Sequence, residues 1–138
     1  MNFKFYIAFV MIYIMLRNMS EVKMKYINAV HDLLIAFSDL PLGDYESSLD
    51  LPYIIYGECF APYIRKMITG NDRKELKHIF SFLEEMAKSE DEDTRDLLQV
   101  AILETFWADK AIFSFVKKYM HPHTREIFNS IGEYLFSP

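Results

Sequence analysis

Apolar and polar residues alternate with the period of an α-helix through most of the second half of the chain. In the helix that residues 71–75 open and Lys88 and Ser89 close, the apolar side chains recur three and four positions apart, so one face is expected to be buried. These residues are Leu76, Ile79, Phe80, Leu83, Met86 and Ala87. Asp72, followed three residues later by Glu75, approximates a capping box at the start of the helix. This pattern predicts a helix that packs on the core through a single stripe.

The next helix is predicted to begin at Asp91 or Asp93 and to run to about Trp107. It is apolar on nearly all sides, which is typical of a central buried helix. Shorter stripes predict helices over 110–120 and 125–136, separated by a break around Pro122. Helices of this length joined by short turns favour antiparallel hairpins. The expected fold class is all-α, either a short solenoid of the HEAT or armadillo kind or a compact irregular helical bundle.

The first half of the chain is less regular. A helix is predicted over 21–38 from the spacing of Ile27, Val30, Leu34 and Phe37. Residues 39–52 form an acidic, turn-rich loop that is long for a connection between helices. Residues 53–69 are apolar and aromatic, and Pro62 within them lacks an amide donor and clashes with the preceding turn. We therefore expect a kink at Pro62 or two short helices near 53–60 and 62–69.

An uninterrupted apolar run, residues 5–16, lies between Lys4 and Arg17. It is shorter than the roughly 20 residues that a membrane-spanning helix needs. The residues after it lack the small-residue cleavage site of a secretory signal peptide. Residues 1–18 are interpreted as an artefact of a misplaced start, a packed helix, or a signal or anchor. We expect one helical domain over 19–138 with an apolar extension before it, and membrane contact through the run is the less favoured alternative.

Composition and charge narrow the class of partner. The chain has 138 residues, 51% of them apolar, which is enough for one domain with a packed core. Its net charge is −5, with −5 in residues 84–96 and −4 in residues 39–50, so the remainder carries +4. Phosphate contacts need Lys and Arg, so we expect no nucleic-acid partner but a basic protein. The single cysteine, Cys59, fits a reducing cytoplasm.

No catalytic or metal-binding pattern is found in the sequence. His121 and His123 flank a proline, and no cysteine or third histidine lies nearby to complete a metal site. Patterns of nucleophilic catalysis and phosphate binding are missing. Glu84 and Glu85 are adjacent and therefore point to different sides of their helix. We expect no enzyme activity, no cofactor and no metal.

Four segments between residues 51 and 128 resemble a known family. They read, in order, LPYIIYGECFA, FLEEMA, DLLQVAILETF and KYMHPHTR. This is similar to a family of small helical bacterial proteins of unassigned biochemistry, some of which are encoded beside polymorphic or contact-dependent toxins. Proteins encoded next to such toxins typically act as immunity proteins.

The resemblance implies a cytoplasmic immunity protein that binds a cognate toxin domain, such as a nuclease, and blocks its active site. The expected partner-binding residues combine the acidic segments with two aromatic anchors. They are Asp44, Glu46, Asp50, Tyr53, Tyr56, Glu90, Asp91, Glu92, Asp93 and Asp96. The alternative is a helical protein–protein adaptor or regulatory scaffold without catalytic activity.

Overall fold

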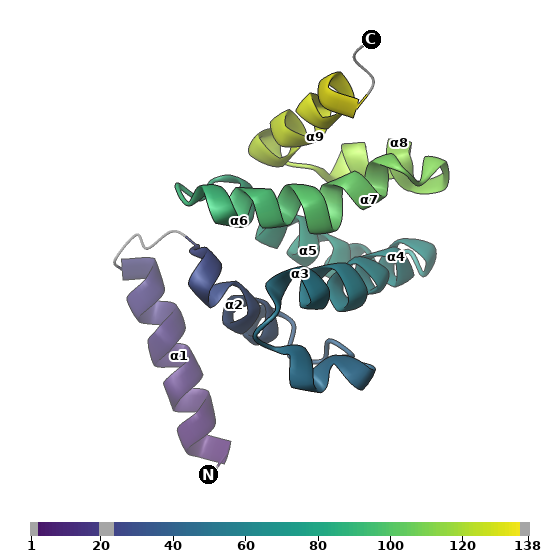
Figure 1. Cartoon of the computed structure of the whole chain (residues 1–138). Helices are drawn as coiled ribbons and strands as arrows, with labels where there is room; N and C mark the ends of the chain where they lie inside the picture. Colours follow the sequence, from purple (N-terminus) through teal and green to yellow (C-terminus); the bar gives the residue numbers. More distant parts are fainter. Residues whose placement is uncertain (1–2, 20–23, 136–138) are drawn as a thin grey trace.

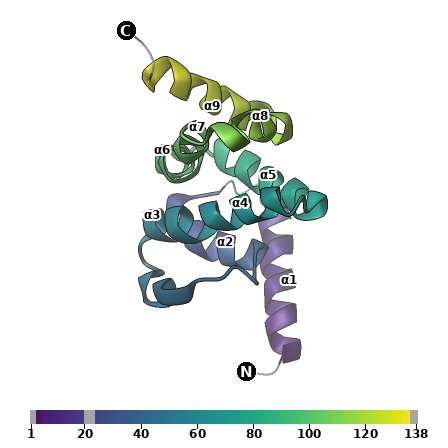
Figure 2. The same ribbon diagram turned by 90° about the vertical axis from the view of Figure 1, so that its right-hand side faces the viewer.

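The computed structural model describes residues 3–19 and 24–135, and within these residues it is helical and contains no strand. The predicted all-α class is confirmed, and the helices pack as a compact bundle. Successive elements are stacked along the molecule, from the N-terminal helices at one end to α9 (Pro122–Leu135) at the other (Figure 1). Figure 2 shows the same order from the side.

The helix α5 (Arg73–Ala87) carries the stripe that its sequence predicts. All six stripe residues, Leu76, Ile79, Phe80, Leu83, Met86 and Ala87, are buried. The helix packs against α4 (Ala61–Thr69) on one side and α9 on the other. Its N-cap is confirmed as well, because the Asp72 carboxylate accepts a hydrogen bond of 3.2 Å from the Glu75 amide.

The central helix is built from three consecutive parts. These are α6 (Glu92–Leu97), the π-helical η4 (Leu98–Leu103) and α7 (Glu104–Trp107). Leu97, Leu98, Ile102, Leu103 and Phe106 are fully buried, as the apolar sequence predicts. Val100 is an exception with 48% of its surface exposed, because the wider π turn changes the side to which each residue points.

A second π-helical turn accommodates Pro62 within a continuous helix. α3 (Pro52–Ile55) continues through η3 (Tyr56–Phe60) into α4 without an intervening loop. The wide turn lies just before Pro62, where an α-helical carbonyl would meet the proline ring. The expected disruption therefore takes the form of a local change of helix type. The two π segments, η3 and η4, lie against each other.

The helix predicted over 21–38 is shorter than expected. A 3-10 turn, η1 (Tyr26–Asn28), leads into α2 (Ala29–Ala36), and residues 20–23 lie outside the described part of the chain. Ile27 is 87% exposed, so the expectation that it points inward is wrong. A 3-10 helix has three residues per turn, and the α-helical spacing on which that expectation rests does not extend into it. The long loop holds a second 3-10 helix, η2 (Gly43–Ser48).

The last two helices close the bundle. α8 (Lys110–Tyr119) starts after Asp109, whose carboxylate accepts from the Ala111 amide at 3.1 Å. α9 begins at Pro122, three residues earlier than predicted. Proline fits the first helical position because the amide that it lacks would have no partner there.

The apolar N-terminal run lies in α1 (Phe3–Met19), which extends beside α2 and away from the bundle (Figures 1 and 2). Its described contact with the bundle runs through Tyr13, whose ring lies edge-on to His31 at 5.3 Å and whose hydroxyl bonds to Asp32. Among the described helices, none has both the length and the apolar character that a membrane crossing requires. The division into 1–18 and 19–138 stays a prediction.

Candidate functional site

The acidic corner after α5 is held together by Asp91. Its carboxylate accepts hydrogen bonds from the Tyr26 amide at 2.7 Å, the Asp93 amide at 3.1 Å and the Thr94 hydroxyl at 3.2 Å. The bond from Tyr26, followed by the others, holds the pKa of Asp91 below its usual range. Asp91 therefore caps α6 and fastens η1 to it, whereas a role for it in binding a partner stays untested.

The remaining acids of the corner point to the surface. Glu90, Glu92, Asp93 and Asp96 are exposed, as are Asp44, Glu46 and Asp50 in and after η2. The two tyrosines that were expected to act together differ in their exposure to solvent. Tyr53 is 41% exposed, whereas Tyr56 is fully buried and its hydroxyl donates to the Ala29 carbonyl at 2.7 Å. Tyr56 is a core residue, and the prediction that it anchors a partner does not fit its position.

Tyr53 lies beside Tyr26 and is influenced by the acids of α6. Its ring lies 6.2 Å from that of Tyr26. Burial raises the pKa of the Tyr53 hydroxyl, and neighbouring Tyr26, Asp96 and Asp93 raise it further. The carboxylates of α6 therefore influence the pKa of a side chain on α3. Tyr26 was missed by the sequence analysis because its position next to Tyr53 depends on the fold.

We name the resulting surface the acidic–apolar face. Its apolar residues are exposed side chains at the end of η2 and the start of α3, and its acids come from η2 and α6. They are Leu49, Leu51, Tyr53, Ile54, Asp44, Glu46, Asp50, Asp93 and Asp96. η2, α3 and α6 follow one another along one side of the molecule, on the left in Figure 2. The fold thus brings together two acidic segments that are about 40 residues apart in the chain.

A second cluster of polar groups joins α5 to α9 and was not foreseen. The Glu84 carboxylate is buried and accepts four hydrogen bonds from the start of α9. Thr124 donates its amide and hydroxyl at 2.9 Å each, and His123 contributes its amide at 3.2 Å and its Nδ1 at 2.8 Å. Glu84 is therefore an N-cap supplied by another helix, and it stabilises the packing of α9 on α5.

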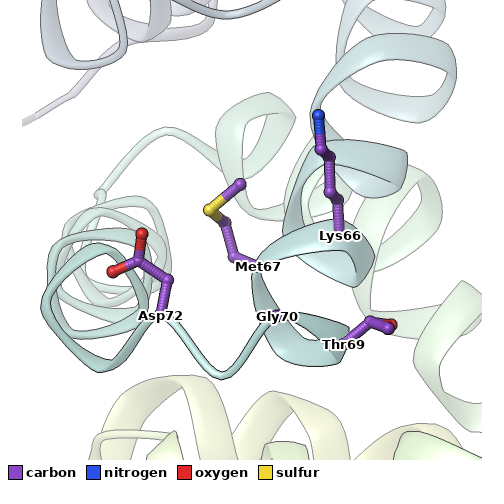
Figure 3. A pocket seen from close by; sticks show the side chains of 5 residues that line it. All are labelled: Lys66, Met67, Thr69, Gly70 and Asp72. Carbon is purple, nitrogen blue, oxygen red and sulfur yellow. The ribbon is translucent and has the colours of Figure 1, made fainter.

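Two surface hollows adjoin α4, one at its turn into α5 and the other between its first half, η3 and Pro41. The larger, of about 510 Å³, is lined by Lys66, Met67, Thr69, Gly70 and Asp72. Figure 3 shows Lys66 and Asp72 on opposite sides of it, with Met67 between them. Asp72 caps α5 with its carboxylate, and Lys66 is the other charged residue that lines the hollow.

The smaller hollow, of about 180 Å³, includes Cys59 among its lining residues. The thiol is buried and lies 3.8 Å from the Leu42 carbonyl, to which it donates. Burial, followed by the charge of Glu58, raises the pKa of Cys59, which lowers the fraction of reactive thiolate. Within residues 3–19 and 24–135, no cluster of three or more His, Cys, Asp or Glu side chains could hold a metal ion.

Comparison with known proteins gives a family but no activity. Residues 28–135 match the family described as Domain of unknown function (DUF7674), and the chain belongs to this family. No curated protein and no solved structure matches the chain. Membership agrees with the resemblance to a small helical family of unassigned biochemistry. The association with toxins finds no support in these comparisons.

Proposed function

We propose that this member of the DUF7674 family binds a basic protein domain on the acidic–apolar face. The observation that carries the proposal is the position of exposed apolar side chains between carboxylates from two distant segments. Leu51 and Tyr53 are 49% and 41% exposed and lie close to Asp50 in sequence, and the charges of Asp96 and Asp93 contribute to the raised pKa of Tyr53. Large apolar residues ringed by charge are typical of a protein interface.

The two kinds of residue have different tasks in this proposal. The carboxylates attract a cationic partner and orient its approach, which chiefly raises the association rate. Tyr53 and its apolar neighbours lose water on contact and slow dissociation. The phenol of Tyr53 is protonated at neutral pH, so it can donate a hydrogen bond to the partner.

The more specific form of the proposal is an immunity protein that neutralises a cognate toxin domain. Its support is the sequence resemblance and the negative charge of the face, which suits a basic nuclease. A helical adaptor or scaffold without catalytic activity would use the same face. The absence of enzyme activity, the cytoplasmic location and the lack of a nucleic-acid partner stay predictions.

The first experiment measures binding of the chain to the protein domain encoded beside its gene, over a range of salt concentrations. Reversal of two charges, Asp93→Lys with Asp96→Lys, is expected to slow association about tenfold and to weaken its dependence on salt. Tyr53→Ala is expected to speed dissociation, at a cost of about 1–2 kcal/mol in binding free energy. The matched control is Glu126→Lys, an exposed acid on α9 at the far end of the bundle.

Co-expression then separates the two forms of the proposal. Restored growth of cells that produce a toxic neighbour, lost again with Asp93→Lys and Asp96→Lys, would identify an immunity protein. A salt-sensitive complex without protection would identify an adaptor. Absence of any complex, or a complex that tolerates both charge reversals as well as it tolerates Glu126→Lys, would contradict the proposal.

A further inference from the structure

The helix α1 leaves large apolar side chains uncovered in the part whose side chains the structure describes, between residues 7 and 14. Ile7, Phe9, Met11, Ile12 and Ile14 are between 42% and 67% exposed. At 3.6 residues per turn, these positions cover more than half of the circumference of the helix. The bundle meets the opposite side, where Tyr13 contacts α2. A surface of this kind is costly in water, so it needs something that covers it.

We propose that α1 inserts into one leaflet of a lipid bilayer and tethers the bundle to the membrane surface. A protein groove covers one stripe of a helix, and a helix adapted to it keeps a polar opposite face. Between Lys4 and Arg17 this helix has no charged or amide side chain, and its uncovered arc is too wide for a single groove. Fluid acyl chains can cover such an arc completely.

The length of the apolar run fits insertion into one leaflet. Its twelve residues span roughly 18 Å as a helix, which is less than the roughly 30 Å of a bilayer core. The run has a cationic residue at each end, Lys4 and Arg17. A helix that lies within one leaflet places both ends near the headgroups, and anionic headgroups attract cationic residues.

The position of α1 also suits this arrangement. Both views place α1 and the acidic segment η2 on opposite sides of α2 (Figures 1 and 2). A bilayer around α1 would therefore not lie against η2, whose carboxylates would be repelled by anionic lipids. The tether is independent of the proposed protein partner, since the acidic–apolar face contains no residue of α1.

Flotation of the full chain with vesicles of phosphatidylcholine and phosphatidylglycerol tests the proposal. The wild-type chain is expected to float with the vesicles, and Ile12→Glu is expected to reduce the bound fraction about tenfold. Leu135→Glu is the matched control, because Leu135 is 46% exposed and lies at the end of α9. Both substitutions are at exposed positions, so equal thermal unfolding curves would confirm that both variants fold.

Depth measurements make the test independent of flotation. Trp107 is the only tryptophan in the chain, and it lies in α7, distant from the lipid in this arrangement. Brominated lipids are expected to quench the added tryptophan of Phe9→Trp and to leave the wild-type emission unchanged.

Three results would overturn the tether. The first is a wild-type chain that does not float, and the second is flotation that Ile12→Glu leaves unchanged. The third is a wild-type chain that sediments as a dimer, does not float, and becomes a monomer with Ile12→Glu. That result would mean that a second copy covers α1. None of these results involves the protein partner, so the proposed function would stand or fall separately.

Discussion

At the residue scale, the charge state of Glu84 links the fold to pH. Burial alone would raise the pKa of this carboxyl, but the hydrogen bonds from Thr124 and His123 outweigh burial and lower it. A folded pKa below the unfolded one means that the ionised group stabilises the fold at neutral pH. This contribution is lost as the pH falls from the unfolded value, near 4.5, through the folded pKa.

Glu84→Gln should therefore weaken the fold and change its response to acid. The amide lacks the charge that four donors share, so we expect a loss of about 2 kcal/mol at pH 7. Below about pH 4 the difference from wild type should shrink, because the wild-type carboxyl becomes protonated there. Urea unfolding across this pH range measures both effects.

Glu85→Gln is the control for that substitution. Glu85 is the next residue, 61% of its side chain is exposed, and it pairs with Lys88 at the surface. Its loss should cost less than about 0.5 kcal/mol. Equal losses for the two variants would show that the bonds to α9 contribute little.

The same residues mark the limit of what the sequence predicts. The local cap at Asp72 was predictable because its donor lies three residues away, whereas the donors to Glu84 lie 39 and 40 residues away. Tyr53 and Tyr56 are alike in sequence context, yet one is exposed and the other fully buried. Which of them faces a partner depends on how α3 and η3 pack, and this is a property of the fold.

At the element scale, periodicity sufficed wherever a regular α-helix packs through one stripe. α5 is such a helix, and its predicted face and cap are confirmed. The pattern failed at η1 and η4, since 3-10 and π turns do not follow the α-helical period. Ile27, which was expected to point inward, and Val100, which lies in the helix expected to be buried, are exposed for this reason.

The contact between α7 and α9 depends on Gly132. A Cβ atom there would lie 2.6 Å from Cη2 and 2.7 Å from Cζ2 of Trp107. The indole is also fixed in place, because its Nε1 donates to the Phe128 carbonyl at 2.6 Å. A rigid ring cannot yield as a flexible side chain can, so the two helices must move apart or tilt if Gly132 is replaced.

Gly132→Ala is therefore expected to lower the free energy of unfolding by about 1–3 kcal/mol. The Trp107 emission should shift with it, because the ring environment changes. Gly57→Ala is the matched control, since a Cβ at Gly57 meets nothing within 4 Å. That substitution should be neutral or should stabilise by up to about 1 kcal/mol, because alanine restricts the unfolded chain. If both variants unfold alike, the close approach of the ring to Gly132 is not a packing constraint.

At the scale of the whole molecule, the chain consists of a bundle and a helix beside it. The buried core begins with Met24, and none of the α1 side chains that the structure describes belongs to it. The family match likewise starts at Asn28, after α1. Stability should accordingly reside mainly in residues 24–135, to which the described part of α1 adds the contacts of Tyr13 with Asp32 and His31.

Removal of residues 1–18 tests this division. We expect the free energy of unfolding to fall by about 1–2 kcal/mol, the worth of one hydrogen bond to a charged group. Tyr13→Phe in the full chain should lower the free energy of unfolding at least as much. Asp32 then stays buried but loses the hydrogen bond from Tyr13, whereas truncation lets water reach its carboxylate.

Tyr56→Phe provides the reference within the core. It removes the bond to the Ala29 carbonyl and should destabilise the full and the shortened chain equally, since additivity holds for sites that do not interact. A truncation that costs several kcal/mol more than Tyr13→Phe, or that changes the effect of Tyr56→Phe, would show that α1 is an integral part of the core.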